Sequence, residues 1–256
     1  MGGLLVIQAR LGSSRLPAKV LADIDGRSML QMVIERAGRA HSVDEIVVAT
    51  TTDSSDDELV QKAQEYGADV IRGDSFDVLA RFGTVLDAYP LADPIVRVTA
   101  DCPFIDAAII DRLLDLQKQT GADYVSNRLP PPWKRTSPVG LDVEVVRREA
   151  LEIAIKTATD DHDREHVMPY LYRHPDRFSI VVDDLESDLS TYRWTVDTPE
   201  DLQAVREIAH RLGPEPFGWM DVLRVASNNP WIAELNATVT QKAVHEVDGR
   251  WERPVR

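Results

Sequence analysis

Short apolar runs alternate with amphipathic segments along the first half of the chain, and this alternation constrains the fold more than any other feature. The apolar runs have the length of strands buried on both faces, and each is followed by a segment with helical spacing. We therefore expect strands at residues 4–9, 45–51, 69–73, 94–100 and 123–127, and helices at 28–40, 56–66, 77–89 and 106–119. Such alternation predicts an α/β fold with a mostly parallel sheet covered on both faces.

The pattern is less regular in the second half. Residues 127–140 are rich in Pro and polar residues and are expected to form a long loop. Further helices are expected at 148–158, 164–174 and 199–212, strands at 141–146 (with one face in water), 178–185 and 191–197, and an irregular segment from 214. The chain thus divides into a domain over residues 1–212 and a C-terminal appendage, 213–256, to which the sequence assigns no role.

Helix starts are marked by capping residues. Ser28 with Gln31, and Ser55 with Glu58, have the spacing of a capping box. Thr198 precedes a proline at the first helical position, which is also typical of a helix start.

Composition excludes several classes of function. The 256 residues carry 29 Lys and Arg against 43 Asp and Glu, a net charge of −14, which argues against nucleic acid or anionic lipid as a partner. The single cysteine, Cys102, excludes an internal disulfide and a multi-cysteine metal site. No signal-peptide pattern and no apolar run of membrane-spanning length is present, so a cytoplasmic location is expected.

The loop after the first expected strand, QARLGSSRLPAKVL, is a positive island in this acidic chain. From Leu4 to Ala22 the only charged residues are Arg10, Arg15 and Lys19. A loop that follows the first strand of a parallel sheet lies at the carboxyl edge, where α/β folds bind ligands. The backbone N–H groups of 12–14 are suited to a phosphate there. The loop matches neither a Walker A motif nor G-x-G-x-x-G. The alternative is that these cations are simply solvated.

Together with later segments, this loop resembles the cytidylyltransferases that activate acidic sugars, such as the CMP-Kdo and CMP-acylneuraminate synthetases, and above all the SpsF-like subgroup. The resemblance is carried by AR-x-GS-x-RLP-x-K-x-L and G-R-S-M-L, and then by DEIVVATTTDSSDD, RVTADCPFID, GLDVEV, DREHVMPY and RWTVDTPEDL. These motifs occur in order over residues 4–210. Ala100 stands where the subgroup usually has glycine.

The resemblance implies a three-layer, Rossmann-like nucleotide-diphospho-sugar transferase fold with a mixed, mostly parallel sheet. It also implies that CMP is transferred from CTP to a sugar acid with release of pyrophosphate, for cell-surface or spore-coat polysaccharide biosynthesis. Carried onto this chain, the nucleotide-binding residues are Arg10, Gly12, Ser13, Arg15 and Lys19. Arg15, Lys19 and Asp101 are then catalytic residues, and Asp101 with Asp197 holds Mg²⁺.

The positions of the two aspartates agree with that metal role. Asp101 follows the apolar strand 94–100 and Asp197 follows the expected strand 191–197, so both should emerge at one edge of the sheet. The alternatives are a turn residue before Pro103 for Asp101 and helix capping for Asp197.

Candidates for the sugar site are less specific. Asp142 and Glu144 point to one face if their segment is a strand, and Glu165 with His166 follows a helix start. We interpret these four residues as sugar-binding candidates. The alternatives are a solvated edge strand for the first pair and a structural histidine for the second.

Competing functions remain open at this point. A GT-A glycosyltransferase normally carries Asp-x-Asp at the end of a central strand, where this chain has Asp101-Cys102-Pro103. A nucleotidyltransferase that uses another nucleoside triphosphate is also compatible, because phosphate- and metal-binding residues do not read the base. A non-enzymatic relative is disfavoured because all the expected site residues are present, and the irregular middle segment leaves room for a homodimer interface. We expect Lys19→Ala or Asp101→Asn to lower turnover by orders of magnitude with little loss of folding stability.

Overall fold

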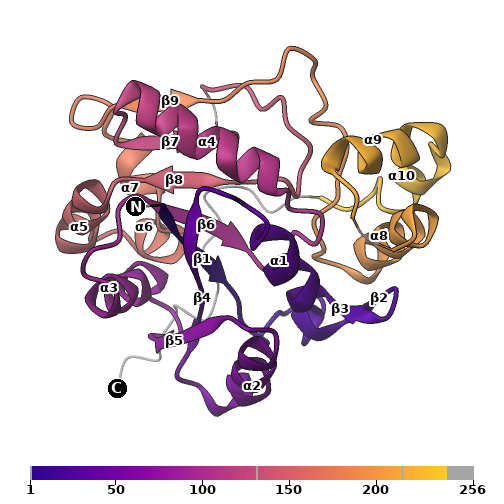
Figure 1. Cartoon of the computed structure of the whole chain (residues 1–256), viewed down its shortest axis with the longest axis horizontal. Coiled ribbons are helices and arrows are strands. Elements are labelled where there is room, and N and C mark those ends of the chain that lie inside the picture. The colour runs from indigo at the N-terminus through magenta and orange to yellow at the C-terminus, as the bar shows by residue number, and fades with distance from the viewer. Residues whose placement is uncertain (1, 131, 215, 241–256) are drawn as a thin grey trace.

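A seven-stranded mixed sheet organises the computed structural model, which describes residues 2–130, 132–214 and 216–240 (Figure 1). The strand order is β5-β4-β1-β6-β8-β7-β9, and β8 alone runs antiparallel to its two neighbours. The mostly parallel sheet predicted from the alternation is confirmed. The strands are β1 Gly3–Gln8, β4 Val43–Thr51, β5 Asp69–Gly73, β6 Ile95–Thr99, β7 Tyr124–Ser126, β8 Glu144–Val146 and β9 Ile180–Val182, beside a small hairpin of β2 Asp23–Ile24 and β3 Arg27–Ser28.

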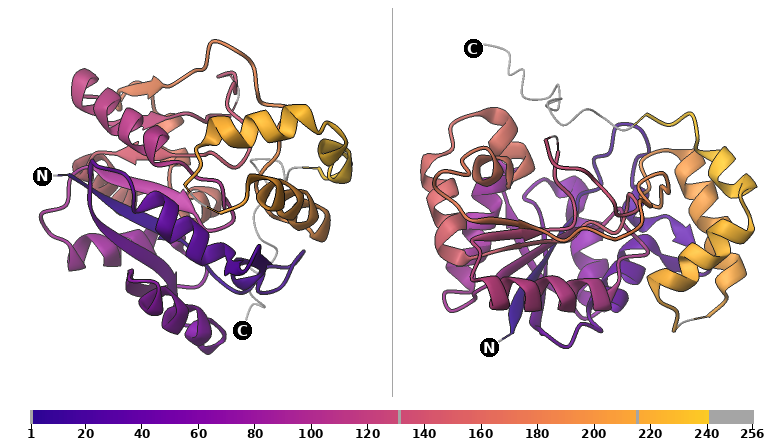
Figure 2. Two further views of the ribbon diagram at one scale, coloured as in Figure 1. Left: turned by 45° about the vertical axis from the view of Figure 1, so that its right-hand side comes forward. Right: turned by 90° about the horizontal axis from the view of Figure 1, so that it is seen from above.

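Helices cover both faces of the sheet (Figure 2). One face is covered by α1 Met29–Ala37, α2 Asp57–Glu65 and α4 Ala107–Thr120, and the other by α3 Val78–Ala88, α5 Arg148–Thr157, α6 Asp161–His166 and α7 Pro169–Tyr172. A group of three further helices lies to one side, on the right in Figure 1: α8 Pro199–Leu212, α9 Trp219–Asn228 and α10 Trp231–Leu235. Among the described residues no helix is both long and apolar enough to span a membrane.

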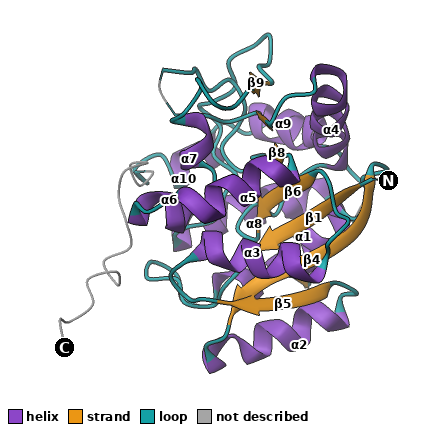
Figure 3. Cartoon of the chain, turned by 90° about the vertical axis from the view of Figure 1, so that its left-hand side faces the viewer, coloured by secondary structure: helices purple, strands orange, loops and turns teal. Residues whose placement is uncertain are grey.

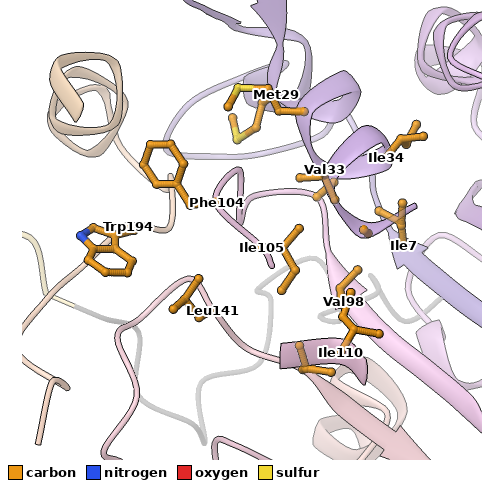
Figure 4. Packing of buried hydrophobic residues seen from close by; sticks show 14 of the residues in the cluster. Ile7, Met29, Val33, Ile34, Val98, Phe104, Ile105, Ile110, Leu141 and Trp194 are labelled. Atoms are coloured by element: carbon orange, nitrogen blue, oxygen red, sulfur yellow. The ribbon is translucent and has the colours of Figure 1, made fainter. Parts of the chain in front are cut away.

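Alternation along the strands builds two cores, one on each side of the sheet. In β1, Leu5 and Ile7 point into the cluster under α1 and α4, whereas Leu4 and Val6 point into the cluster under α3 and α5. Figure 4 shows the first cluster, where Ile7 lies among side chains of α1, β6 and α4. Each fully buried aliphatic side chain contributes about 1.5–3 kcal/mol, so a strand buried on both faces is fixed in register.

The helix caps agree with the sequence in part. Ser28 accepts a hydrogen bond from the Gln31 amide, and Thr198 forms a reciprocal capping box with Asp201. The predicted box of Ser55 with Glu58 is wrong, because Asp53 caps the preceding 3₁₀ turn, η2 Ser54–Asp56, and α2 has no side-chain cap.

Three expectations about residues 141–197 are wrong. Strand β8 has no wet face, because all three of its residues, Glu144 included, are buried. Segment 191–197 is not a strand: it makes one bridge, Arg193 to Val139, and the Val196 amide then bonds to the Asp101 carbonyl. The helix expected over 164–174 begins earlier and is interrupted between α6 and α7, where Val167 has φ 73° and Pro169 cannot continue the ladder.

The segment from 214 is not irregular throughout, because it forms α9 and α10, and residues 241–256 lie outside the described part of the chain. Val222, Ala226 and Ile232 of these helices belong to the same buried cluster as α1 and α4. The division into a domain at 1–212 and an appendage at 213–256 stays a prediction.

Candidate active site

A cavity of about 280 Å³ lies at the carboxyl ends of β1 and β6, beside the loop that follows β1 (Figure 3 shows this edge of the sheet from the side). Its walls come from five segments that are far apart in the sequence. The predicted site residues that line it are Arg10, Ser13, Ser14, Arg15, Lys19, Asp101, Glu165, His166 and Asp197, and the residues not predicted include Gln8, Phe76, Arg81 and Thr99.

Hydrogen bonds of the Leu11 backbone hold the loop after β1 in place, ahead of Lys19. The Leu11 amide bonds to the carboxylate of Asp56 (2.7 Å), and the Leu11 carbonyl accepts from the amides of Ser13 and Ala18. Ala18 has φ 54°, a left-handed conformation that is unfavourable for a residue with a Cβ. The chain then enters the 3₁₀ turn η1 Lys19–Leu21, which is packed against α1.

The ammonium group of Lys19 lies between the two predicted metal ligands. Its Nζ donates to Asp101 Oδ2 (2.8 Å), Asp197 Oδ1 (2.9 Å) and the Val196 carbonyl (2.7 Å). An ammonium has three donors, so these bonds satisfy it completely. The structure therefore brings Lys19, Asp101 and Asp197 together, as the sequence predicted.

Electrostatics keep this cluster ionised. Burial alone would lower the pKa of Lys19, but the carboxylates of Asp101 and Asp197 outweigh burial and raise it. Burial likewise opposes ionisation of Asp101, but Lys19 and a hydrogen bond from Thr99 lower the pKa of Asp101 to about 2. At neutral pH the group is a cation between two anions.

Two arginines complete the environment of Asp197. Arg15 Nη2 lies 3.0 Å from Asp197 Oδ1, and Arg193 Nη2 donates to Oδ2 at 2.9 Å. Arg193 was not predicted as a site residue. Its position four residues before Asp197 and eight before the capping Asp201 is a signal that it pairs with one of these acids. The Nε of Arg193 donates to Asp201 Oδ1 at 2.8 Å.

Arg81 is a further site residue that sequence analysis overlooked. It is 1 % exposed, it lines the cavity from α3, and it donates to the Asp74 carbonyl. Burial and the nearby charge of Arg10 lower the pKa of Arg81 to about 10. A cation on the apolar face of the expected helix 77–89 was the available signal. Two neighbouring guanidinium groups beside one cavity favour an anionic ligand.

Not every predicted residue lines the cavity. Gly12 is not among its walls, and the Ser13 amide is used inside the loop, so the backbone cradle expected at 12–14 is only partly available. Asp142 pairs with Arg135, and Glu144 accepts from Arg97 and from Tyr124 Oη. The sugar-binding roles of Asp142 and Glu144 stay predictions, whereas Glu165 and His166 lie on the cavity wall.

The carboxylates present suit a hard divalent cation that is also held by a ligand. Within residues 2–130, 132–214 and 216–240, no group of three His, Cys, Asp or Glu side chains is close enough to hold a metal alone. Mg²⁺ is normally held by one or two carboxylates together with substrate phosphates. Asp101 and Asp197 supply ionised oxygen donors on either side of one point, so the donor set fits that ion.

A mixed α/β sheet with a cation-lined cavity at the ends of its first strands is the arrangement of the Rossmann-like nucleotidyltransferases, and solved structures of this class confirm the fold. A cytidylyltransferase from Leptospira borgpetersenii is 31 % identical, with a TM-score of 0.85 over 93 % of this chain and 98 % of that one. A CMP:2-keto-3-deoxy-manno-octonic acid synthetase complexed with CTP is 21 % identical, with a TM-score of 0.64 over 83 % of this chain and 100 % of that one.

Residues 4–229 match the cytidylyltransferase family, and the chain belongs to that family. The spore coat polysaccharide biosynthesis protein SpsF of Bacillus subtilis is 29 % identical over 235 residues, which cover 89 % of this chain and 95 % of that protein. The resemblance seen in the motifs is confirmed: the chain is an SpsF-like cytidylyltransferase. The family match extends beyond residue 210, where the motifs end, to α9.

Proposed function

We propose that this enzyme transfers CMP from CTP to a sugar acid, with release of pyrophosphate, in the biosynthesis of a surface polysaccharide. The observation that carries the proposal is the position of Lys19 between Asp101 and Asp197, in a cavity that Arg10, Arg15 and Arg81 also line. The names of relatives support the finer assignment, because one is a spore-coat polysaccharide protein and another is a synthetase complexed with CTP.

The chemistry requires positive charge in a fixed position. When an acceptor oxygen attacks the α-phosphorus of CTP, negative charge develops on the phosphoryl oxygens and on the departing pyrophosphate. Cations that are already in place stabilise this charge without reorganisation at the moment of reaction. Arg10, Arg15 and Lys19 supply such charge from one loop, Arg81 supplies it from α3, and Ser13 adds a hydroxyl donor.

Asp101 and Asp197 would hold the divalent cation, Mg²⁺, at the end of β6 and at the start of α8. Such an ion would supply positive charge that stabilises the negative charge developing on the phosphates. In the structure the same carboxylates neutralise Lys19. We infer that Lys19 turns from these carboxylates toward the phosphates when CTP and the ion bind.

The acceptor sugar would approach from the wall formed by α6. Glu165 and His166 line the cavity there, and offer a carboxylate and an imidazole ring for sugar hydroxyls. The strand pattern of the sequence also makes Asp142 and Glu144 candidates for the sugar, and this stays a prediction.

The test is a comparison of thermal stability with CTP, UTP, GTP and ATP, each with Mg²⁺. A ligand present at 100 times its dissociation constant adds about 2.7 kcal/mol to the free energy of unfolding. We expect a clear increase with CTP and a smaller one with the other nucleotides, followed by CTP-dependent pyrophosphate release when sugar acids such as 3-deoxy-manno-octulosonate are supplied. A response to UTP or GTP instead would change the nucleotide. A response to nucleotide-sugars, and to no triphosphate, would favour a glycosyltransferase.

A further inference from the structure

The segment that follows α10 places a buried amide behind the active site. Asn236 is 5 % exposed, and its Nδ2 donates to Asp201 Oδ1 at 2.9 Å and to the Arg193 carbonyl at 3.3 Å. Both acceptors belong to the segment that carries Asp197, more than thirty residues earlier in the chain. Asn236 thus connects the C-terminal helices to a carboxylate of the site.

The connection passes through Asp201, which is fully buried at the start of α8. Asp201 Oδ2 accepts from the amides of Asp197 (3.0 Å) and Thr198 (3.2 Å) and from Arg193 Nη2 (2.9 Å). Its Oδ1 accepts from Arg193 Nε (2.8 Å) and from Asn236. Arg193 Nη2 in turn bonds to Asp197 Oδ2. Oδ2 of Asp197 is therefore held by a chain of hydrogen bonds that ends at Asn236, whereas Oδ1 contacts Lys19 and Arg15.

Side-chain packing around Arg193 does not by itself fix the position of its guanidinium group. An open cavity of about 420 Å³ lies between residues 190–194, α8 and α10, and both Arg193 and Asn236 line it. A guanidinium beside a cavity has room to move, so its position depends on the groups that bond to it. Two of those bonds go to Asp201, and the main chain that carries Arg193 is bonded to Asn236.

We propose that Asn236 is a positioning residue for Asp197, and that the C-terminal helices α9 and α10 complete the nucleotidyl-transfer site through it. The inference rests on the proposed function, because the value of a fixed Asp197 lies in holding the divalent cation and the triphosphate. Residues that orient a metal-binding carboxylate typically change metal affinity or activity by 10- to 100-fold when they are replaced. The role differs from structural support of the fold, which would affect stability alone.

The test uses the full chain and three replacements of Asn236. Asn236→Ala removes the amide, Asn236→Leu removes it while keeping the volume in case the alanine variant unfolds, and Asn236→Gln keeps the donor, with its extra methylene directed into the cavity. Asn229→Ala is the matched control. Its Nδ2 donates to the Val225 carbonyl at 2.9 Å within the C-terminal helices, and this bond is outside the hydrogen-bond chain described above. The readouts are the Mg²⁺ concentration for half of the CTP-induced rise in melting temperature, the same concentration for pyrophosphate release, and the unfolding midpoint in urea without ligands.

We expect Asn236→Ala and Asn236→Leu to raise both Mg²⁺ requirements by about tenfold, Asn236→Gln to stay near wild type, and Asn229→Ala to change neither. Unchanged Mg²⁺ requirements in the first two variants, beside a normal wild-type response to CTP, would overturn the inference alone. So would an equal increase in Asn229→Ala, because it would show a general effect of loosening the helices. A wild-type protein that responds to no triphosphate at any Mg²⁺ concentration removes the proposed function, and this inference with it.

Discussion

Lys19→Met removes the ammonium group shared by Asp101 and Asp197 and leaves a side chain of similar length. In the structure, this ammonium makes two ion pairs, at 2.8 and 2.9 Å. From the sequence alone we expect replacement of Lys19 to cause little loss of stability. A residue that contacts only the substrate does not contribute to the free energy of unfolding of the free protein. The ion pairs change that expectation: replacement leaves two partly buried carboxylates facing one another.

The size of the effect follows from burial and from the remaining partners. Removal of one partner from a buried ion pair typically costs about 3–5 kcal/mol. Here the Asp101 and Asp197 side chains are 26 % and 18 % exposed, and Asp197 keeps Arg15 and Arg193. We therefore expect the lower end, about 3 kcal/mol of the free energy of unfolding. We also expect turnover to fall about 10²- to 10³-fold, as when one preorganised charge-stabilising donor is removed.

Urea unfolding of the ligand-free protein measures the first quantity, and CTP-dependent pyrophosphate release measures the second. Lys62→Met is the matched control, because the ion pair of Lys62 with Glu65 is on the surface of α2 and should add little. The double variant Lys19→Met, Asp101→Asn removes the unpaired charge and should recover part of the lost stability. A loss below about 1 kcal/mol in Lys19→Met, or no recovery in the double variant, would show that the ammonium is not held between the carboxylates.

Three other replacements test the structure. Because the pKa of Asp101 is lowered to about 2, its stabilising effect is present above pH 4 and is lost as pH falls from about 4 to 2; the stability difference between wild type and Asp101→Asn in urea should shrink by about 2 kcal/mol over that range, and a constant difference would contradict the ion pair. Glu144→Gln should cost about 3 kcal/mol, because it leaves Arg97 buried without its acid, while the KM for the sugar stays unchanged; a raised KM with normal stability would favour the sugar-binding role. Gly140→Ala should cost at least about 2 kcal/mol, because φ is 107° and a Cβ would lie 2.5 Å from the Thr195 nitrogen; near-wild-type urea midpoints would refute this.

The first half of the fold was predictable because each element carries its own local signal. Strands such as β1 and β6 are buried on both faces, so their apolar runs are nearly continuous, and helices such as α4 end at a glycine with positive φ. The second half carries weaker local signals. Strand β8 has only three residues and begins with an acid, Glu144, and it is a strand because β6 and β7 lie on either side of it.

The parallel topology also explains why part of the site could be located. The carboxyl ends of β1 and β6 are neighbours in the sheet, with Gln8 opposite Thr99, so the loop that carries Lys19 must meet the turn that carries Asp101. The placement of Asp197 was right for a different reason than the one given, since its segment is not a strand. It reaches the site because the Val196 amide bonds to the Asp101 carbonyl and Gly140 lets the chain at Trp194 approach closely.

The groups that orient the site residues could be predicted only in part, because the spacing of Arg193 indicates an acidic partner but tertiary structure determines the whole network. Arg193 precedes Asp197 by four positions and Asp201 by eight. The motif is typical of a helix start, and capping alone accounts for Asp201 in the sequence. In the structure, one carboxylate caps α8, pairs with Arg193 and accepts from Asn236. Replacement of Asp201 would remove all three interactions and so move Asp197. The sequence motif VDTPED therefore determines the geometry of the site as well as the start of a helix.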